Sequence, residues 1–169
     1  LKSRGVTGLI AKRFRLGFAP KKWNYVLDNM LEGGLTENDL ERAGLVVSND
    51  KGNRYDRFRG RIIFPIVDHR KRVIGFGGRI VGEGQPKYLN SPETEVFQKR
   101  RALYGLEQTL ANKNLKEILV VEGYMDVIAL NQFGMSNVVA TLGTSVTEHH
   151  IERVLSHTSV VRFCFDGDS

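Results

Sequence analysis

The sequence contains a single cysteine, Cys164, among its 169 residues. One cysteine forms neither an internal disulfide framework nor a cysteine-based zinc site, so a reducing cytoplasm is the simplest location. No apolar stretch reaches the roughly 18 residues that a membrane helix needs. The first residues, LKSRGVTGLIAKRF, also lack the apolar core and cleavage pattern of a signal peptide. We therefore expect a cytoplasmic protein with no membrane partner.

An initiator methionine is also missing, and the sequence stops directly after the acidic motif FDGDS. We interpret the chain as a fragment of a longer protein. Hydrophobic residues make up 41% of it and charged residues 26%, which is typical of globular proteins. This length suffices for one domain, or for a small domain and part of a second.

The net charge of +6 is unevenly distributed along the chain. Residues 1–104 contain 21 lysines and arginines against 11 acids, whereas residues 105–169 contain 4 against 8. A basic first half and an acidic second half favour two tasks, binding a polyanion and binding cations. A solvated surface with no partner is the alternative.

The first half of the sequence predicts an irregular α+β structure. We expect short helices at 7–14, 21–33 and 36–43, and a hairpin within 60–80 whose polar turn lies near His69. A loop rich in glycine and proline should follow, and then a short helix before Phe97.

The second half alternates between apolar runs and helical patterns. The runs are EILVV, NVVATLG and SVVRFCF, and the helical segments between them are EGYMDVIALNQFG and TEHHIERVLSH, the latter capped by Ser145 or Thr147. The order β-α-β-α-β, with strands apolar on both faces, predicts a parallel sheet. We place the domain boundary near 112–116, which gives an N-terminal domain at 1–115 and a second domain at 116–169.

Acidic residues follow two of these predicted strands. Glu122 comes directly after the first and Asp166 directly after the third, so both should lie at the same carboxyl edge of the sheet. Asp126 lies one helical turn after Glu122, and one glycine separates Asp168 from Asp166. Carboxylates this close repel one another, and a divalent cation such as Mg²⁺ or Mn²⁺ relieves the repulsion. Read alone, an Asp-x-Asp pair is also common in acidic turns without function.

These acidic motifs, VVEGYMD and FDGD, resemble the Toprim domain, a metal-binding α/β module of primases, topoisomerases and related nucleases. Upstream, DRFRGRIIFPI, RVIGFGGRI, PKYLNSPET and ALYGL resemble the RNA-polymerase region of bacterial replicative DNA primases of the DnaG type. The resemblance covers nearly the whole chain. It implies an α/β fold, in which a basic N-terminal α+β subdomain precedes the first β-α-β-α-β part of a Toprim parallel sheet.

The same resemblance implies metal-dependent nucleotidyl transfer, the synthesis of short RNA primers on single-stranded DNA. Ribonucleoside triphosphates would be the substrates and an RNA–DNA hybrid the product. Glu122, Asp166 and Asp168 match the family's catalytic residues, and with Asp126 they match its ligands for Mg²⁺ or Mn²⁺. We expect a monomer in the bacterial cytoplasm, at the nucleoid. The family's zinc-binding module and the module that contacts the replicative helicase are absent from this sequence, as are later Toprim acids, so we expect the chain alone to be inactive or nearly so.

Basic residues of the first half also match family positions. Arg79, Lys87 and Asn90 match residues that bind the incoming nucleotide; Gly77 and Gly78 before Arg79 would permit close approach of a ligand, and we expect Lys87 and Asn90 in a loop. Five further residues are candidate DNA-binding residues, namely Arg57, Arg59, Arg61, Lys99 and Arg100. If the segment RFRGR is extended, its three arginines form a charged row on one face. A solvated edge strand would look the same.

Two positions depart from the family pattern, because Lys71 and Arg100 stand where it often has glycine. Three other residues are given no site role. His149 and His150 are neighbours on a helix without a partner at metal-ligand spacing, and Cys164 is expected to be a small apolar residue in a buried strand.

Two rival functions remain open on the sequence. One is a non-catalytic module that binds single-stranded DNA or a phosphate-rich regulator such as a guanosine polyphosphate. The other is a Toprim nuclease or topoisomerase, which would need a catalytic tyrosine domain or nuclease partner residues that the sequence does not contain.

Overall fold

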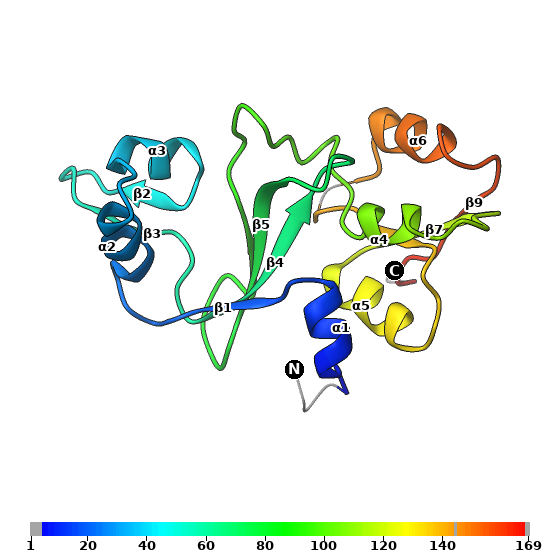
Figure 1. Ribbon diagram of the computed structural model, residues 1–169, viewed down its shortest axis with the longest axis horizontal. Coiled ribbons are helices and arrows are strands. Elements are labelled where there is room, and N and C mark those ends of the chain that lie inside the picture. Colours follow the sequence, from blue (N-terminus) through cyan, green and yellow to red (C-terminus); the bar gives the residue numbers. More distant parts are fainter. Residues whose placement is uncertain (1–4, 144, 168–169) are drawn as a thin grey trace. The chain divides into compact units, whose positions relative to one another are not determined.

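The computed structural model describes residues 5–143 and 145–167 (Figure 1). Spatial contacts divide the chain into two compact units. Unit 1 contains residues 1–16, 65–74 and 98–169, and unit 2 contains residues 17–64 and 75–97. The predicted division of the sequence after residue 115 stays a prediction.

Unit 2 contains most of a four-stranded sheet in the order β1-β4-β5-β6, whose residues 65–67 and 73–74 belong to unit 1. Its strands are β1 (Gly17–Ala19), β4 (Arg61–Val67), β5 (Val73–Ile80) and β6 (Tyr88–Asn90). A second, two-stranded sheet pairs β2 (Val46–Ser48) with β3 (Arg54–Asp56), next to α2 (Tyr25–Glu32) and α3 (Glu37–Arg42). The predicted hairpin is confirmed, because β4 and β5 are neighbours in the sheet.

Local sequence signals set the helix ends. Thr36 accepts a hydrogen bond from the Asp39 N–H, and the Asp39 carboxylate accepts one from the Thr36 N–H, so the two residues cap α3 reciprocally. Gly44, just past this helix, has a φ of +68°, and a side chain there would also collide with Pro92. Glycine is therefore required at this turn both by the backbone and by the space.

Unit 1 contains a three-stranded parallel sheet in the order β8-β7-β9 (Figure 1). Its elements are α1 (Gly8–Arg13), α4 (Leu106–Leu110), β7 (Ile118–Val121), α5 (Tyr124–Gln132), β8 (Val138–Ala140), α6 (Glu148–Leu155) and β9 (Val161–Phe163). Leu119 pairs with Val138 on one side and with Arg162 on the other, which places β7 in the centre. The predicted parallel β-α-β-α-β unit is confirmed, and Thr147 caps α6.

The core of unit 1 forms where α4 and α6 cover one face of this sheet. Leu106 from α4 and Val154 from α6 pack with Ile118, Val120 and Val139, all of them nearly inaccessible to solvent. Because alternate residues of a strand face opposite sides, Leu119 and Val121 belong to the other face. There, α5 packs on β8 and buries Val127 and Ile128.

Three expectations about the elements are wrong. The third strand is not buried on both faces, since β9 is an edge strand whose Phe163 is 49% exposed, and Cys164 after it is exposed as well. No helix precedes Phe97, because the Thr94 hydroxyl accepts the N–H groups of Val96 and Phe97 and closes a turn instead. The sequence patterns also missed α4, which has only five residues.

Across residues 5–143 and 145–167, no helix has both the length and the apolar character needed to cross a membrane.

Candidate functional site

The carboxyl edge of the parallel sheet brings two predicted acids together. Glu122 follows β7 directly, and its Oε1 accepts a hydrogen bond of 3.0 Å from the backbone N–H of Asp166, which follows β9. Just before it, the N–H of Cys164 donates to the Val120 carbonyl at 2.9 Å, so the chain after β9 stays beside the end of β7. Both carboxylates are exposed to solvent. The prediction that Glu122 and Asp166 share one edge therefore agrees with the described backbone.

The other two acids differ from this pair. Asp126 is exposed in the first turn of α5, and its Oδ2 accepts the Gly123 N–H at 3.0 Å, so one of its oxygens caps the helix. Asp168 lies outside the described residues. Within the described residues, no three acids, histidines or cysteines gather into a group that could hold a metal ion. The assignment of Glu122, Asp126, Asp166 and Asp168 as catalytic or metal-binding residues stays a prediction.

Buried aromatic rings anchor the backbone next to Glu122. Tyr124 begins α5 and packs edge-on against Tyr104, with ring centres 4.8 Å apart, and Phe14 of α1 lies against the other tyrosine at 5.8 Å. Burial raises the pKa of the Tyr124 hydroxyl and that of Tyr104, so both phenols are neutral at physiological pH. The packed Tyr124 ring therefore anchors the turn between β7 and α5. Because Glu122 lies in this turn, the anchor restricts the position of the Glu122 backbone.

The donor chemistry at this edge fits a hard divalent cation. Carboxylate oxygens are the only strong ligands there, and exposure leaves room for the waters that Mg²⁺ and Mn²⁺ retain. In the described part of the chain, neither the Glu122 Oε2 nor the Asp166 carboxylate forms a hydrogen bond. These oxygens are therefore available to a cation, whereas zinc would usually be bound through nitrogen or sulfur ligands as well.

In unit 2, the predicted nucleotide-binding residues lie along the antiparallel pair β5–β6. Arg79 pairs with Tyr88, and Gly77 pairs with Asn90. Because alternate residues share a face, Arg79, Tyr88 and Asn90 lie on the same side of the sheet. Lys87 is in the exposed loop just before β6, as predicted, whereas Asn90 lies in a strand and not in a loop.

Arg79 contains an unusual buried polar atom. Its Nε is shielded from solvent and forms no hydrogen bond within the described structure, while its guanidinium carbon lies 5.8 Å from the centre of the Tyr88 ring. Buried N–H groups of this kind are uncommon in folded proteins, because each one left without an acceptor costs about 1–3 kcal/mol. An anionic ligand over β5 and β6 would supply the missing acceptor.

The glycine before Arg79 has a structural reason of its own. A Cβ on Gly78 would lie 2.7 Å from Cδ1 of the buried Phe58 and 3.1 Å from Cδ of Arg61. The absence of a side chain at this position therefore serves packing inside unit 2. The predicted role of this glycine in ligand approach has no support from its surroundings.

The three arginines of RFRGR do not form a row on one face. Residues 57–60 are not a strand, and β4 begins only at Arg61. Arg57 donates two hydrogen bonds, of 3.0 and 2.9 Å, to the Asn90 carbonyl, and Arg61 is buried with its Nη1 3.5 Å from the Lys87 carbonyl. Burial lowers the pKa of both guanidinium groups. These two residues thus support the backbone of the predicted nucleotide-binding residues, and their assignment to DNA stays a prediction.

Arg59 has a different environment, which the sequence patterns missed. Its guanidinium lies over the rings of Trp23, at 4.3 Å, and Tyr55, at 4.9 Å, and it donates to the Asp56 carbonyl. Trp23 is 63% exposed. An exposed indole held by an arginine is a surface on which a nucleobase can stack. A sequence prediction of this surface would have had to pair Arg59 with Trp23, an aromatic residue more than thirty positions away.

The last two predicted DNA-binding residues belong to unit 1. Lys99 and Arg100 lie in a turn before Ala102, where their carbonyl groups accept hydrogen bonds from the His150 Nε2–H, at 3.1 Å, and the Thr147 hydroxyl, at 2.6 Å. These contacts fix the turn against the start of α6. Arg100 is exposed, and Lys99 is half-buried.

Comparison with known proteins identifies both parts of the chain. Residues 1–110 match the family described as the DNA primase catalytic core, N-terminal domain, and residues 116–169 match the Toprim domain. The DNA primase of Pseudomonas aeruginosa is 55% identical over 99% of this chain, and that of Escherichia coli K12 is 52% identical over 99%. The chain spans about a quarter of the length of these relatives, 26% and 29%.

Solved structures agree with these sequence matches. A DNA primase domain from Pseudomonas aeruginosa has a TM-score of 0.94 and 54% identity, with 100% of this chain and 53% of that one covered. The DnaG primase catalytic domain bound to single-stranded DNA has a TM-score of 0.91 and 51% identity, with 99% and 55% covered. The predicted fold class and the predicted relation to bacterial primases are confirmed. The chain belongs to the DNA primase family: its first 110 residues match the N-terminal domain of the catalytic core, and a Toprim segment follows them.

Proposed function

We propose that this chain supplies the template-binding and nucleotide-binding surfaces and the acidic edge of a DNA primase, an RNA polymerase that makes short primers on single-stranded DNA. The observation that carries the proposal is the contact between Glu122 and Asp166. It sets the Glu122 carboxylate against the backbone of Asp166, at the edge where open α/β sheets bind their ligands. The matches to the primase core and to the Toprim domain support nucleotidyl transfer as the reaction class.

At the acidic edge, the role of the protein is to hold oxygen ligands in place. Glu122 would bind Mg²⁺ or Mn²⁺ through its free Oε2 while Oε1 remains tied to the backbone after β9. Asp166 and Asp168 would complete the ligands on the neighbouring strand, with Asp126 close by. When bound, such cations lower the pKa of an attacking hydroxyl and neutralise charge on phosphate. The rigid turn at Tyr124 limits how far the Glu122 carboxylate can move.

In unit 2, the residues on β5 and β6 would bind the triphosphate of an incoming ribonucleotide. Arg79 is partly exposed, and its guanidinium supports this assignment because phosphate oxygens accept charge-assisted hydrogen bonds from arginine. Lys87 adds an exposed positive charge from the adjoining loop, and Asn90 lies on the same face as Arg79. Arg57 would act through Asn90, whose carbonyl it holds.

The template would be single-stranded DNA, as in the related DnaG structure that was solved with it. Arg59 with Trp23 offers a stacking surface, and Lys99 and Arg100 add cationic contacts. The remaining partners follow from the family: an RNA–DNA hybrid product, and the replicative helicase through a module outside this sequence. A monomer in the bacterial cytoplasm is the expected state.

Primer synthesis by a chimeric enzyme tests the proposal. In the Pseudomonas aeruginosa primase, this chain replaces the quarter that it matches, and incorporation of ribonucleotides on single-stranded DNA is measured with Mg²⁺ or Mn²⁺. We expect Glu122→Gln and Asp166→Asn to reduce the rate at least about 100-fold, which is the scale of losing a group that acts on charge in the transition state. Glu32→Gln, an exposed change at the end of α2, is the matched control.

Unchanged rates in the two acidic variants would refute the catalytic assignment. The chain on its own should make little or no primer under the same conditions, and robust synthesis would show that its described acids suffice. Metal-dependent cleavage of DNA in place of synthesis would favour the nuclease alternative, and binding that ignores both metal and Asp166 would favour the non-catalytic module.

A further inference from the structure

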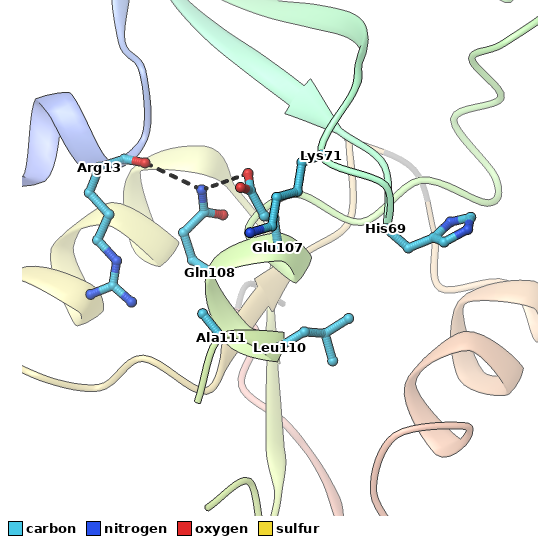
Figure 2. Close-up of a pocket in the computed structure, with 7 residues that line it drawn as sticks. All are labelled: Arg13, His69, Lys71, Glu107, Gln108, Leu110 and Ala111. Carbon is cyan, nitrogen blue, oxygen red and sulfur yellow. Dashed lines mark hydrogen bonds between the residues drawn. The ribbon is translucent and has the colours of Figure 1, made fainter. Parts of the chain in front are cut away.

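Unit 1 contains a group of basic side chains that the proposed function does not use. They line two depressions of about 390 and 420 Å³. The first is lined by residues of α1, of the turn between β4 and β5, and of α4 (Figure 2). The second is lined mainly by residues of α6. We call five of their basic residues the cationic strip: Arg13, His69, Lys71, Arg101 and Arg153. His149 lines the second depression as well.

The two depressions meet at a contact between two members of the strip. The Nη2 of Arg153 donates a hydrogen bond of 3.2 Å to Nδ1 of His69. Figure 2 shows the His69 ring directed away from Glu107, on the side of the α6 ribbon. His157 is part of the same neighbourhood, since burial first, then Arg153 and then His69 lower its pKa. The contact between His69 and Arg153 therefore joins the β4–β5 turn of the strip to α6.

The four lysine and arginine side chains of the strip outnumber the two acids that line the same depressions, Glu107 and Glu152. Glu107 is already paired with Arg15, at 2.5 Å, and Glu152 lies 3.4 Å from His149. In the part of the chain that the structure describes, the four lysine and arginine side chains of the strip have no carboxylate within ion-pair distance. An uncompensated group of this kind attracts an anion and holds it with charge-assisted hydrogen bonds.

Arg153 of the strip lies toward the opposite end of the sheet from the acidic edge, whereas Arg101 lies beside the start of α6. Helix α6 leads from the carboxyl end of β8 to the amino end of β9, so Arg153 and Ser156 near its end lie toward the amino ends of the strands. Ala111, after α4, precedes the segment that enters the amino end of β7. Glu122 and Asp166 lie at the carboxyl ends. The strip is thus a separate surface of unit 1.

The shape and composition of the strip favour a linear polyanion. A single phosphate would occupy one depression only, whereas a sugar–phosphate backbone can cross both. Among the described residues, the lining contains no phenylalanine, tyrosine or tryptophan, so it offers no large ring on which a base could stack. An acidic peptide would usually bind through large apolar anchors as well, and Leu110 is the only large apolar side chain that lines the two depressions.

We propose that the cationic strip binds the sugar–phosphate backbone of nucleic acid, without reading its bases, at a second site away from the acidic edge. The proposal rests on the proposed function, in which the chain works on a nucleic-acid strand. A polymerase gains from such a site because it holds the strand during synthesis without restricting its sequence.

Salt-dependent filter binding of a radiolabelled single-stranded oligonucleotide to the 169-residue chain tests this site. Each of Lys71→Gln, Arg101→Gln and Arg153→Gln should weaken binding, and each should make the slope of log K against log salt shallower by about 0.7, the effect of one lost phosphate contact. The combined variant Lys71→Gln/Arg101→Gln should change it by about 1.4. Lys51→Gln, in an exposed turn of unit 2, removes the same charge and should leave the slope unchanged. Circular dichroism confirms that each variant is folded.

Slopes equal to that of Lys51→Gln in all strip variants would overturn the proposal. Binding of polyglutamate with the same losses would also overturn it, because the strip would then recognise negative charge in general. The proposed function is tested separately, by the effect of Glu122→Gln on primer synthesis. If that variant is fully active while the strip variants still lose affinity, the proposed function fails and the second site remains.

Discussion

Asp56 caps the N-terminus of α2 although 29 positions separate it from Leu27. Its Oδ2 accepts the Val26 N–H at 2.7 Å, and its Oδ1 accepts the Leu27 N–H at 3.0 Å, with the side chain almost fully buried. Asn24, which precedes the helix, makes no capping bond with its own side chain. A carboxylate at the end of β3 thus satisfies two amides that the local sequence leaves without an acceptor.

Replacing Asp56 should therefore destabilise unit 2. We expect Asp56→Ala to lower the free energy of unfolding by about 2 kcal/mol, because two buried N–H groups lose their acceptor. Asp50→Ala, in the exposed turn between β2 and β3, should change it by less than about 0.5 kcal/mol. Urea unfolding followed by circular dichroism measures both. Equal stabilities for the two variants would contradict the capping role.

Trp23 should contribute to the binding of single-stranded DNA through stacking. Trp23→Ala is expected to weaken binding by about 1–3 kcal/mol, which is the usual contribution of one stacked base, whereas Trp23→Phe should retain part of it. Filter binding at constant salt measures the affinity. Because the lost interaction is not ionic, the salt slope should stay that of the wild type. If the alanine variant binds as well as the wild type, the indole is only a support for Arg59.

Gly78 should be intolerant of even a methyl group. Gly78→Ala would place a Cβ 2.7 Å from the Phe58 ring, so we expect a loss of about 1–3 kcal/mol in the free energy of unfolding. Gly8→Ala is the matched control, since nothing lies within 4 Å of a Cβ there and the residue is in a helix. That change should stabilise the chain by about 0.5–1 kcal/mol. Thermal unfolding measures the stability of both variants. If Gly78→Ala destabilises the chain and Gly8→Ala does not, the collision with Phe58 causes the loss; equal changes would contradict this explanation.

His150 should make the stability of unit 1 depend on pH. Burial lowers its pKa below the ordinary 6.5, and its neutral ring accepts the Thr147 N–H through Nδ1 while Nε2–H donates to the Lys99 carbonyl. The unfolded chain therefore binds a proton at a higher pH than the folded chain does. Stability should fall as pH decreases from 7 through 6.5 toward the lowered pKa, and it should level off below that value.

Replacement of His150 by glutamine tests this dependence. The His150→Gln variant should show a smaller change in unfolding free energy between pH 7 and 5, while His149→Gln, at its exposed neighbour, should retain most of the wild-type change. Identical pH profiles for wild type and His150→Gln would show that another group is responsible.

The parts of the fold that follow from local signals were predictable. Apolar runs between helical patterns gave the parallel sheet, and side chains such as Thr36 and Thr147 gave helix starts. The shape of residues 57–60 was not predictable, because the guanidinium groups of Arg57 and Arg61 bind backbone carbonyls that are 33 and 26 positions away. Periodicity carries no information about such long-range contacts.

The candidate site was predictable to a similar extent. The position of Glu122 beside Asp166 follows from strand order alone, whereas the cap that occupies one oxygen of Asp126 depends on the turn at Gly123. Lys71 is instructive, because its φ of +63° lies in the left-handed region that glycine adopts most easily. The departure from the family pattern is thus a lysine held in a left-handed turn, and it contributes to the cationic strip.

The contact of Trp23 with Arg59 also has a spectroscopic consequence. The chain contains one tryptophan, so all of its indole emission comes from a single place in unit 2. Quenching or a shift of that emission reports on the stacking surface alone, and it is silent about unit 1, where the acids lie. The chain therefore carries a built-in fluorophore that separates binding at the Trp23 surface from binding at the acidic edge.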